Sequence, residues 1–164
     1  MRRHQYVRAG ILFGFLAILT VAGCASMRSG MKPGSGDVVA DRQRLMRLNG
    51  ASWGDIQAKA KAGNIEGIAV NAETLAMNAE HIPSMFPQGS LTDKSKAKPE
   101  VWQKFTEFQA ASQNMATLSA RLRDAAKAKD AATVDAMVKE FGGKACGTCH
   151  NPFRVPPPPP PRSS

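Results

Sequence analysis

The sequence lacks the patterns on which most enzymes and most β-sheet folds depend. It contains no Ser-His-Asp set, no paired carboxylates and no glycine-rich phosphate loop, which are common signs of hydrolysis or phosphoryl transfer. No stretch alternates apolar and polar residues in the manner of a half-buried β-strand. We therefore predict an all-α protein that is not an enzyme.

Cysteine and histidine are scarce, with three of each among 164 residues. A structural zinc site needs four nitrogen or sulfur ligands, and a thioredoxin-like redox pair needs a βαβ pattern nearby, so the sequence disfavours both. Two cysteines and one histidine nevertheless form the run Cys146-Gly147-Thr148-Cys149-His150. Cys-x-x-Cys-His is the attachment signature of a c-type haem, and a chance match is the alternative.

The motif suits one covalently attached haem c. Cys146 and Cys149 would form thioether bonds with the two vinyl groups, and His150 would supply the proximal ligand of the iron. Residues three and four apart share one face of a helix. These three side chains would therefore hold the porphyrin edge and the iron on a single helical surface.

No apolar run is long enough to cross a bilayer, which takes about 20 residues. The run from Ile11 to Ala22 follows three arginines and has the form of a signal peptide. It ends in Val21-Ala22-Gly23-Cys24, which resembles the lipobox of bacterial lipoproteins. We predict a signal peptide over residues 1–24 with lipidation at Cys24, and ordinary cleavage near Ala25 is the alternative.

This interpretation places the protein in the periplasm. No Asp follows Cys24, which by analogy with bacterial lipoproteins favours an anchor in the outer membrane. Residues 25–36 are small, polar and rich in glycine, and we expect a flexible tether. Residues 37–154 form the expected domain, and residues 155–164 form a proline-rich tail that cannot join the core.

The formal charge of the chain is +9. Without the three arginines of the signal segment, 19 basic residues still face 13 acidic ones. Export argues against a nucleic-acid partner, and a solvated helix face is the default explanation of such charges. A basic rim around a haem edge would steer an acidic redox partner of the respiratory chain. A homodimer is left open.

Four segments have helical periodicity. The first extends over residues 37–62 with Asp37 as N-cap, and the second, over residues 65–82, repeats its apolar residues every three or four positions until Pro83. The third spans residues 99–129, and the fourth begins at Asp130 and continues into the haem motif. Four such helices predict an antiparallel up-down-up-down four-helix bundle with the haem between helices.

Two glycines, Gly142 and Gly143, interrupt the fourth helix, where each costs roughly 1 kcal/mol against alanine. A flat ligand that approaches the backbone closely would explain them. A local kink is the alternative.

The sequence resembles the cytochrome c-prime family, the class II c-type cytochromes, from about Asp37 to Arg154. The family carries its haem motif near the C-terminus, as this chain does. The resemblance rests on Arg42-Gln43-Arg44-Leu45-Met46, Phe86-Pro87, Lys98-Pro99-Glu100-Val101-Trp102 and the stretch from Gly143 to Arg154. Pro152, two residues after His150, departs from the family pattern and removes one backbone N–H.

The resemblance implies roles for three further residues. In one branch of the family a methionine of the first helix is the sixth iron ligand and the iron is low-spin, and Met46 favours this branch; a simple pocket wall is the alternative. Arg42 matches a family arginine that pairs with a haem propionate, and an exposed arginine is the alternative. Arg154 matches a position near the haem, with surface exposure equally open.

Three functions compete at this stage. The first is a membrane-tethered periplasmic electron carrier with His150 and Met46 as iron ligands. The second is a five-coordinate, high-spin haem protein that binds nitric oxide or other small gases. The third, a haem-free structural lipoprotein, is disfavoured by the haem motif.

Overall fold

A computed structural model describes residues 37–159 of the protein. The predicted signal peptide, Cys24, the tether and the last five residues of the proline-rich tail lie outside the described residues. Between residues 37 and 159, no helix is both long and apolar enough to cross a membrane.

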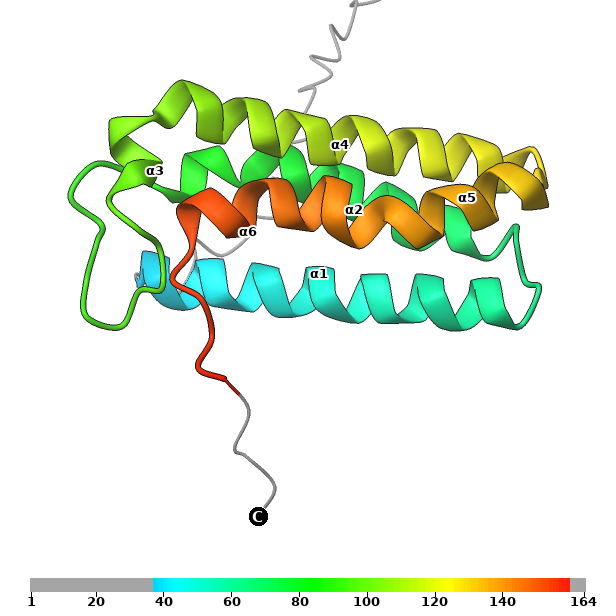
Figure 1. Ribbon diagram of the computed structural model, residues 1–164, viewed down its shortest axis with the longest axis horizontal. Helices are drawn as coiled ribbons and strands as arrows, with labels where there is room; N and C mark the ends of the chain where they lie inside the picture. The colour runs from blue at the N-terminus through cyan, green and yellow to red at the C-terminus, as the bar shows by residue number, and fades with distance from the viewer. Residues whose placement is uncertain (1–36, 160–164) are drawn as a thin grey trace, which may run out of the picture. The chain divides into compact units, whose positions relative to one another are not determined.

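Four long helical segments run alternately up and down (Figure 1). They are α1 (Val38–Lys61), α2 (Ile68–His81), α4 (Phe105–Lys127) and a fourth segment made of α5 (Ala131–Phe141), η2 (Gly142–Gly147) and α6 (Thr148–Phe153). The short helices η1 (Pro83–Met85) and α3 (Glu100–Gln103) lie within the connection between α2 and α4. The predicted all-α antiparallel bundle is confirmed.

The predicted helix starts have clear physical causes. The Asp37 side chain accepts hydrogen bonds from the backbone N–H groups of Val39 and Ala40, at 2.9 and 3.1 Å. The Asp130 side chain accepts from the N–H of Thr133 at 3.0 Å. Such caps satisfy donors that have no partner within the helix. Both N-caps were predicted from the sequence.

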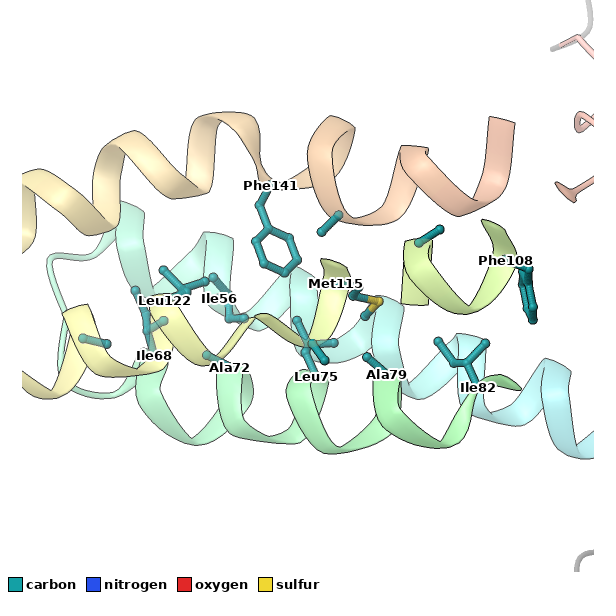
Figure 2. Packing of buried hydrophobic residues seen from close by; sticks show 14 of the residues in the cluster. Ile56, Ile68, Ala72, Leu75, Ala79, Ile82, Phe108, Met115, Leu122 and Phe141 are labelled. Atoms are coloured by element: carbon teal, nitrogen blue, oxygen red, sulfur yellow. The ribbon is translucent and has the colours of Figure 1, made fainter. Parts of the chain in front are cut away.

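The core follows the apolar stripe of α2. Ile68, Ala72, Leu75 and Ala79 of this helix and Ile82 just after it are all buried and lie in a row (Figure 2). α2 packs most extensively on α4 and next on α1. This row belongs to one buried cluster that also takes residues from α1, α4, α5 and the haem-motif segment.

The prediction of one continuous third helix over residues 99–129 is wrong in one respect, because the helix is divided at Lys104. This residue has φ −124° and ψ 46°, outside the helical region, and it separates α3 from α4. The Trp102 indole N–H donates to the carbonyl oxygens of Phe86 and Pro87, at 3.1 and 3.0 Å. α3 is thereby tied to the 83–98 loop.

The fourth predicted helix changes its winding at the two glycines. Gly142–Gly147 form a π-helical segment, and the Lys144 carbonyl accepts side-chain hydrogen bonds from Asn114 and Thr148, at 2.7 and 2.6 Å. π-Helical turns are rare and are frequent at functional sites. Pro152 lies inside the following helix α6, which ends one residue later.

Candidate haem site

A cavity of about 630 Å³ opens within the bundle. This volume is in the range of about 300–1,000 Å³ typical of pockets for small molecules and cofactors. Its walls come from α1, the 83–98 loop, and η2 with α6, and its apolar base includes Leu75, Ile82, Phe108 and Met115 from α2, α4 and the connection after α2.

The haem motif forms one wall of this cavity. Cys146 lies in η2, whereas Cys149 and His150 lie in α6, and all three residues line the cavity. Both cysteines are half-buried and free of disulfides, and His150 is exposed at the opening. Two thiols and an imidazole are therefore presented to one space, as the spacing of the motif predicts.

The electrostatics of this wall distinguish it from a redox dithiol. Burial raises the pKa of the Cys146 thiol, and burial together with the neighbouring Cys146 raises the pKa of Cys149 to about 11. In thioredoxin-like Cys-x-x-Cys pairs the reactive thiol has a lowered pKa. The pair therefore stays protonated at neutral pH, which argues against that class of site.

The surroundings of His150 favour its neutral form. Although it lies at the opening, partial desolvation by the cavity lowers its pKa, and the nearby positive charge of Arg154 lowers it further. The neutral imidazole is the form that binds metals. Within residues 37–159 no group of three or more His, Cys, Asp and Glu side chains is placed to hold a metal ion.

Helix α1 forms the opposing wall. Arg42, Met46, Asn49 and Trp53 all line the cavity. They are spaced by four, three and four residues, so they lie on one stripe of the helix. The predicted sixth ligand, Met46, therefore borders the same space as His150.

Arg42 is not an exposed arginine. Its side chain is only 5% exposed. Its two terminal nitrogens donate to the Ser90 hydroxyl at 3.1 Å and to the Ser90 carbonyl at 2.8 Å, and the guanidinium lies 4.4 Å from the centre of the Phe86 ring. Burial lowers the pKa of Arg42, and the charge of Asp37 partly offsets this effect.

Arg154 lies at the end of α6, half-buried, and lines the cavity. An isolated antiparallel bridge joins it to Ala97. The N–H of Val155 donates to the Lys96 carbonyl at 2.8 Å, and the N–H of Lys98 donates to the Phe153 carbonyl at 2.9 Å. This pairing holds Arg154 beside the 83–98 loop.

The residues present fit a haem. The cavity combines apolar walls with two thiols, one imidazole and the guanidinium groups of Arg42, Arg47 and Arg154. These match the macrocycle, the vinyl groups, the iron and the propionates respectively. One further polar group, the Asn49 amide, is buried at 7% exposure. Its Nδ2 has no hydrogen-bond partner among the described residues, which costs about 1–3 kcal/mol while the cavity offers it none.

Sequence reasoning missed two of these groups. Neither Asn49 nor Met115 belongs to a motif that would mark it as a site residue. Met115 is buried and lines the cavity, so the space contains a second thioether besides Met46. The helical period places both residues on an inward face, but it cannot show which inward positions border a void.

The glycine hypothesis receives no support from this geometry. The cavity lining includes Ala145 and Cys146 but neither Gly142 nor Gly143. A Cβ atom built at either glycine meets nothing within 4 Å. The alternative, a local change in the course of the helix, agrees with the π-helical segment that begins at Gly142.

Comparisons with known proteins agree with this site. The family model described as Cytochrome C' matches residues 37–154. A cytochrome c-556 of Agrobacterium fabrum is 34% identical over 123 residues, which cover 71% of this chain and 80% of that protein. A cytochrome c' of Rubrivivax gelatinosus is 33% identical over 124 residues, covering 73% of this chain and 95% of the relative.

Solved structures have the same fold. The crystal structure of cytochrome c' from Rubrivivax gelatinosus aligns with a TM-score of 0.63 at 29% identity, over 73% of this chain and 95% of that one. A nitric oxide complex of a cytochrome c prime variant from Alcaligenes xylosoxidans aligns with a TM-score of 0.65 over 74% of this chain and 96% of that one. It is 24% identical and supports the fold alone. Taken with the motif and the cavity, these matches show that the chain belongs to the cytochrome c' family, whose members are haem proteins rather than enzymes.

Proposed function

We propose that this protein is a periplasmic electron carrier in which His150 and Met46 are the two axial ligands of a covalently attached haem. The observation that carries the proposal is that Met46 on α1 and His150 on α6 line the same cavity from different walls. Relatives named cytochrome c-556, the low-spin methionine-ligated branch, support it.

Each residue of the site has a defined task in this proposal. Cys146 and Cys149 hold the haem covalently, His150 fixes the position of the iron, and Met46 closes the sixth coordination position against water. A haem bound in this way gains and releases one electron at its iron, and a methionine ligand raises its reduction potential. The buried base of the cavity excludes solvent, so little needs to rearrange when the charge changes.

A gas-binding function is the second candidate. Relatives named cytochrome c' match this chain as extensively as those named cytochrome c-556. Met46 is only half-buried, and it would then serve as a wall beside an open sixth position. The two functions differ in a single bond, between the Met46 sulfur and the iron.

Absorption spectra of the purified haem protein test that bond. If Met46 is a ligand, the oxidised protein is low-spin and shows a weak sulfur-to-iron band in the near infrared. Met46→Ala removes this band, converts the iron to the high-spin form, lowers the reduction potential and allows carbon monoxide to bind the reduced protein.

Met115→Leu is the matched control, because Met115 is the other thioether that lines the cavity. It should leave the band in place. A native protein that is already high-spin and reactive toward carbon monoxide would contradict the electron-carrier proposal and favour the gas binder. Loss of the band in Met115→Leu would assign the ligand to α4 instead of α1.

The charge around the cavity supports an acidic redox partner. The three segments that form the opening, residues 37–50, 83–98 and 150–155, contain seven basic and three acidic residues, whereas the other described residues contain nine basic and ten acidic. Among the ion pairs of the described residues, only Arg44–Asp41 lies in these segments. Arg42 is buried, and we call the other six the basic rim: Arg44, Arg47, Lys94, Lys96, Lys98 and Arg154.

The basic rim attracts negatively charged reactants and concentrates them at the haem edge. Oxidation of the reduced protein by ferricyanide, an anion, should therefore slow as salt is added, whereas oxidation by a cationic cobalt complex should accelerate. Equal salt dependence for both oxidants would contradict the proposed steering.

We also propose that the protein is tethered to the outer membrane through lipidated Cys24. Proteins of this family are typically periplasmic, and the anchor rests on the lipobox alone. Fractionation of cells that express the wild type or Cys24→Ser tests the anchor. The wild type should partition with membranes, and Cys24→Ser should release the protein or block its maturation. A soluble wild-type protein would contradict the anchor.

A further inference from the structure

The two helices that carry the proposed axial ligands make no close backbone contact with each other. Met46 belongs to α1 and His150 to α6, and no Cα atom of α1 lies within 8 Å of a Cα atom of α6. Both helices border the cavity, from different walls. Their separation, which sets the distance between the two ligands, is therefore fixed by other parts of the domain.

The 83–98 loop is bonded to α1 one helical turn before Met46. Arg42 donates to the Ser90 hydroxyl and to the Ser90 carbonyl, at 3.1 and 2.8 Å. The Gln43 amide donates to another carbonyl of the loop at 3.2 Å. Because Arg42 precedes Met46 by four residues, the two lie on the same stripe of the helix. The loop therefore holds α1 at the turn next to the proposed ligand.

The same loop is bonded to the end of α6, the helix that carries the proposed histidine ligand. The N–H of Lys98 donates to the Phe153 carbonyl at 2.9 Å. The N–H of Val155 donates to the Lys96 carbonyl at 2.8 Å. α6 has only six residues and contains Pro152, which supplies no backbone N–H. The position of this short helix therefore depends on its bonds to the loop.

The stretch of the loop between these two attachments has hydrogen bonds of its own. The Ser90 N–H and hydroxyl both donate to the Pro87 carbonyl, at 3.2 and 2.7 Å. The Ser95 N–H donates to the Thr92 carbonyl at 2.9 Å. These bonds close two turns, so the stretch can transmit the position of one helix to the other.

A row of side chains forms a second connection between the helices. The Arg42 guanidinium of α1 lies 4.4 Å from the centre of the Phe86 ring of the loop. Phe86 packs edge-on against Phe108 of α4, and Phe108 packs edge-on against Phe153 of α6, with ring centres 4.8 and 5.3 Å apart. All four residues line the cavity. Polar bonds and ring contacts thus join α1 to α6 through the same loop.

We propose that the 83–98 loop is a brace that sets the separation of Met46 and His150, with Ser90 and Val155 as positioning residues at its two ends. The inference rests on the proposed His/Met ligation. A bond between iron and sulfur forms only over a short distance, so a looser brace lets α1 move away and the bond open more often. The brace thereby controls how firmly the sixth position is closed to small ligands.

The rate at which cyanide replaces Met46 at the oxidised iron tests the brace. At saturating cyanide the opening of the iron–sulfur bond limits this rate. An iron–carbon bond replaces the iron–sulfur bond, and the oxidation state of the iron does not change. Ser90→Ala removes the hydroxyl that bonds Arg42 and should accelerate the exchange roughly two- to tenfold, as expected for the loss of one hydrogen bond. Ser90→Thr retains a hydroxyl and should exchange at nearly the wild-type rate.

Val155 offers a matched pair of variants at the other end of the brace. Val155→Pro deletes the N–H that donates to Lys96. The backbone of Arg154, with φ −124° and ψ 139°, already has the extended conformation that a residue before proline adopts. This variant should accelerate the exchange by a similar factor. Val155→Ala retains the N–H and should not.

Ser112→Ala distinguishes the brace from a general loss of stability. Ser112 of α4 donates to the Ala79 carbonyl of α2 at 2.6 Å, and neither residue lines the cavity. Loss of this buried hydrogen bond should lower the free energy of unfolding, measured by denaturant titration. The rate of cyanide exchange should remain that of the wild type.

The possible results decide between these explanations. A wild-type exchange rate in Ser90→Ala or in Val155→Pro would overturn the inference, because both attachments are needed to fix the separation. Equal acceleration in Ser112→Ala would overturn it as well, because any loss of stability would then open the iron–sulfur bond. Failure of the proposed function is distinguishable, because the native protein would already be high-spin before cyanide is added, and the inference would fall with it.

Discussion

Arg42 links the wall of the cavity to the loop that covers it. The two hydrogen bonds to Ser90 and the contact with the Phe86 ring join α1 to the 83–98 loop across 48 residues of sequence. A buried guanidinium is costly unless it is paired. Ser90 and Phe86 compensate part of this cost, and a haem propionate at the same guanidinium would compensate more.

Replacing Arg42 should therefore loosen the loop. Arg42→Met keeps much of the apolar stem and removes the charge-assisted hydrogen bonds, so we expect a loss of about 2–3 kcal/mol in the free energy of unfolding, measured by denaturant titration. Arg44 is exposed on α1 and does not line the cavity. Arg44→Ala removes only its surface ion pair with Asp41 and should change stability by less than about 1 kcal/mol. Equal losses in the two variants would contradict a specific role of Arg42.

At the scale of single residues, the sequence predicts chemistry better than it predicts surroundings. Cys146, Cys149 and His150 carry a motif whose residues and spacing define the chemistry. Asn49 carries no such signal, because its unused N–H₂ group depends on Asn78, which is 29 residues away. Whether a polar group on an inward face finds a partner is decided by tertiary packing.

At the scale of elements, helix starts were predictable and interruptions were not. Asp37 and Asp130 cap their helices through local hydrogen bonds. An Asp directly before a segment of helical periodicity predicts such a cap. The break at Lys104 accompanies hydrogen bonds from Trp102 to Phe86 and Pro87, 16 and 15 residues away. Such an interruption depends on the position of the loop, which no local pattern reveals.

The π-helical segment offers a test of why its two glycines are there. Gly143 does not have a positive φ, and an added Cβ would meet nothing within 4 Å. Gly143→Ala should therefore stabilise the protein by about 0.5–1 kcal/mol, by restricting the unfolded chain, and haem content should remain unchanged. Unfolding curves and haem absorbance per protein measure both quantities.

Gly63→Ala is the contrasting variant. Gly63 follows the end of α1 with φ +71°, in the left-handed region that alanine adopts only at a cost of about 1 kcal/mol or more. Gly63→Ala should therefore destabilise the protein without changing its haem content. If instead Gly143→Ala lowers haem content, a close approach of the macrocycle to the backbone is the reason for the glycine, and the structural interpretation of the segment is wrong.

At the scale of the whole domain, the α2–α4 pair and the cavity share the core residues Leu75, Phe108 and Met115. α2 and α4 form the most extensive helix pair, and Ser112 of α4 donates a hydrogen bond to the Ala79 carbonyl of α2 at 2.6 Å. The cavity lies where α1, the 83–98 loop and α6 meet. Those three segments face one another across this space.

This arrangement predicts how the protein responds to the loss of its haem. The double variant Cys146→Ala, Cys149→Ala should leave haem extractable, and the extracted protein should melt at a lower temperature than the intact one. Hydrogen exchange should accelerate most in the first half of α1, the 83–98 loop and α6, because these segments border the cavity. Protection in the facing halves of α2 and α4 should change least.

The pattern matters more than the drop in melting temperature, because any destabilised protein exchanges faster overall. Uniform acceleration in all helices would show that the bundle unfolds as one unit and that the cavity has no separate stability. Preferential loss of protection around the cavity would show that the haem acts as the core of one half of the domain. In that case the bundle consists of a pair of helices that holds itself together and a second half that the cofactor completes.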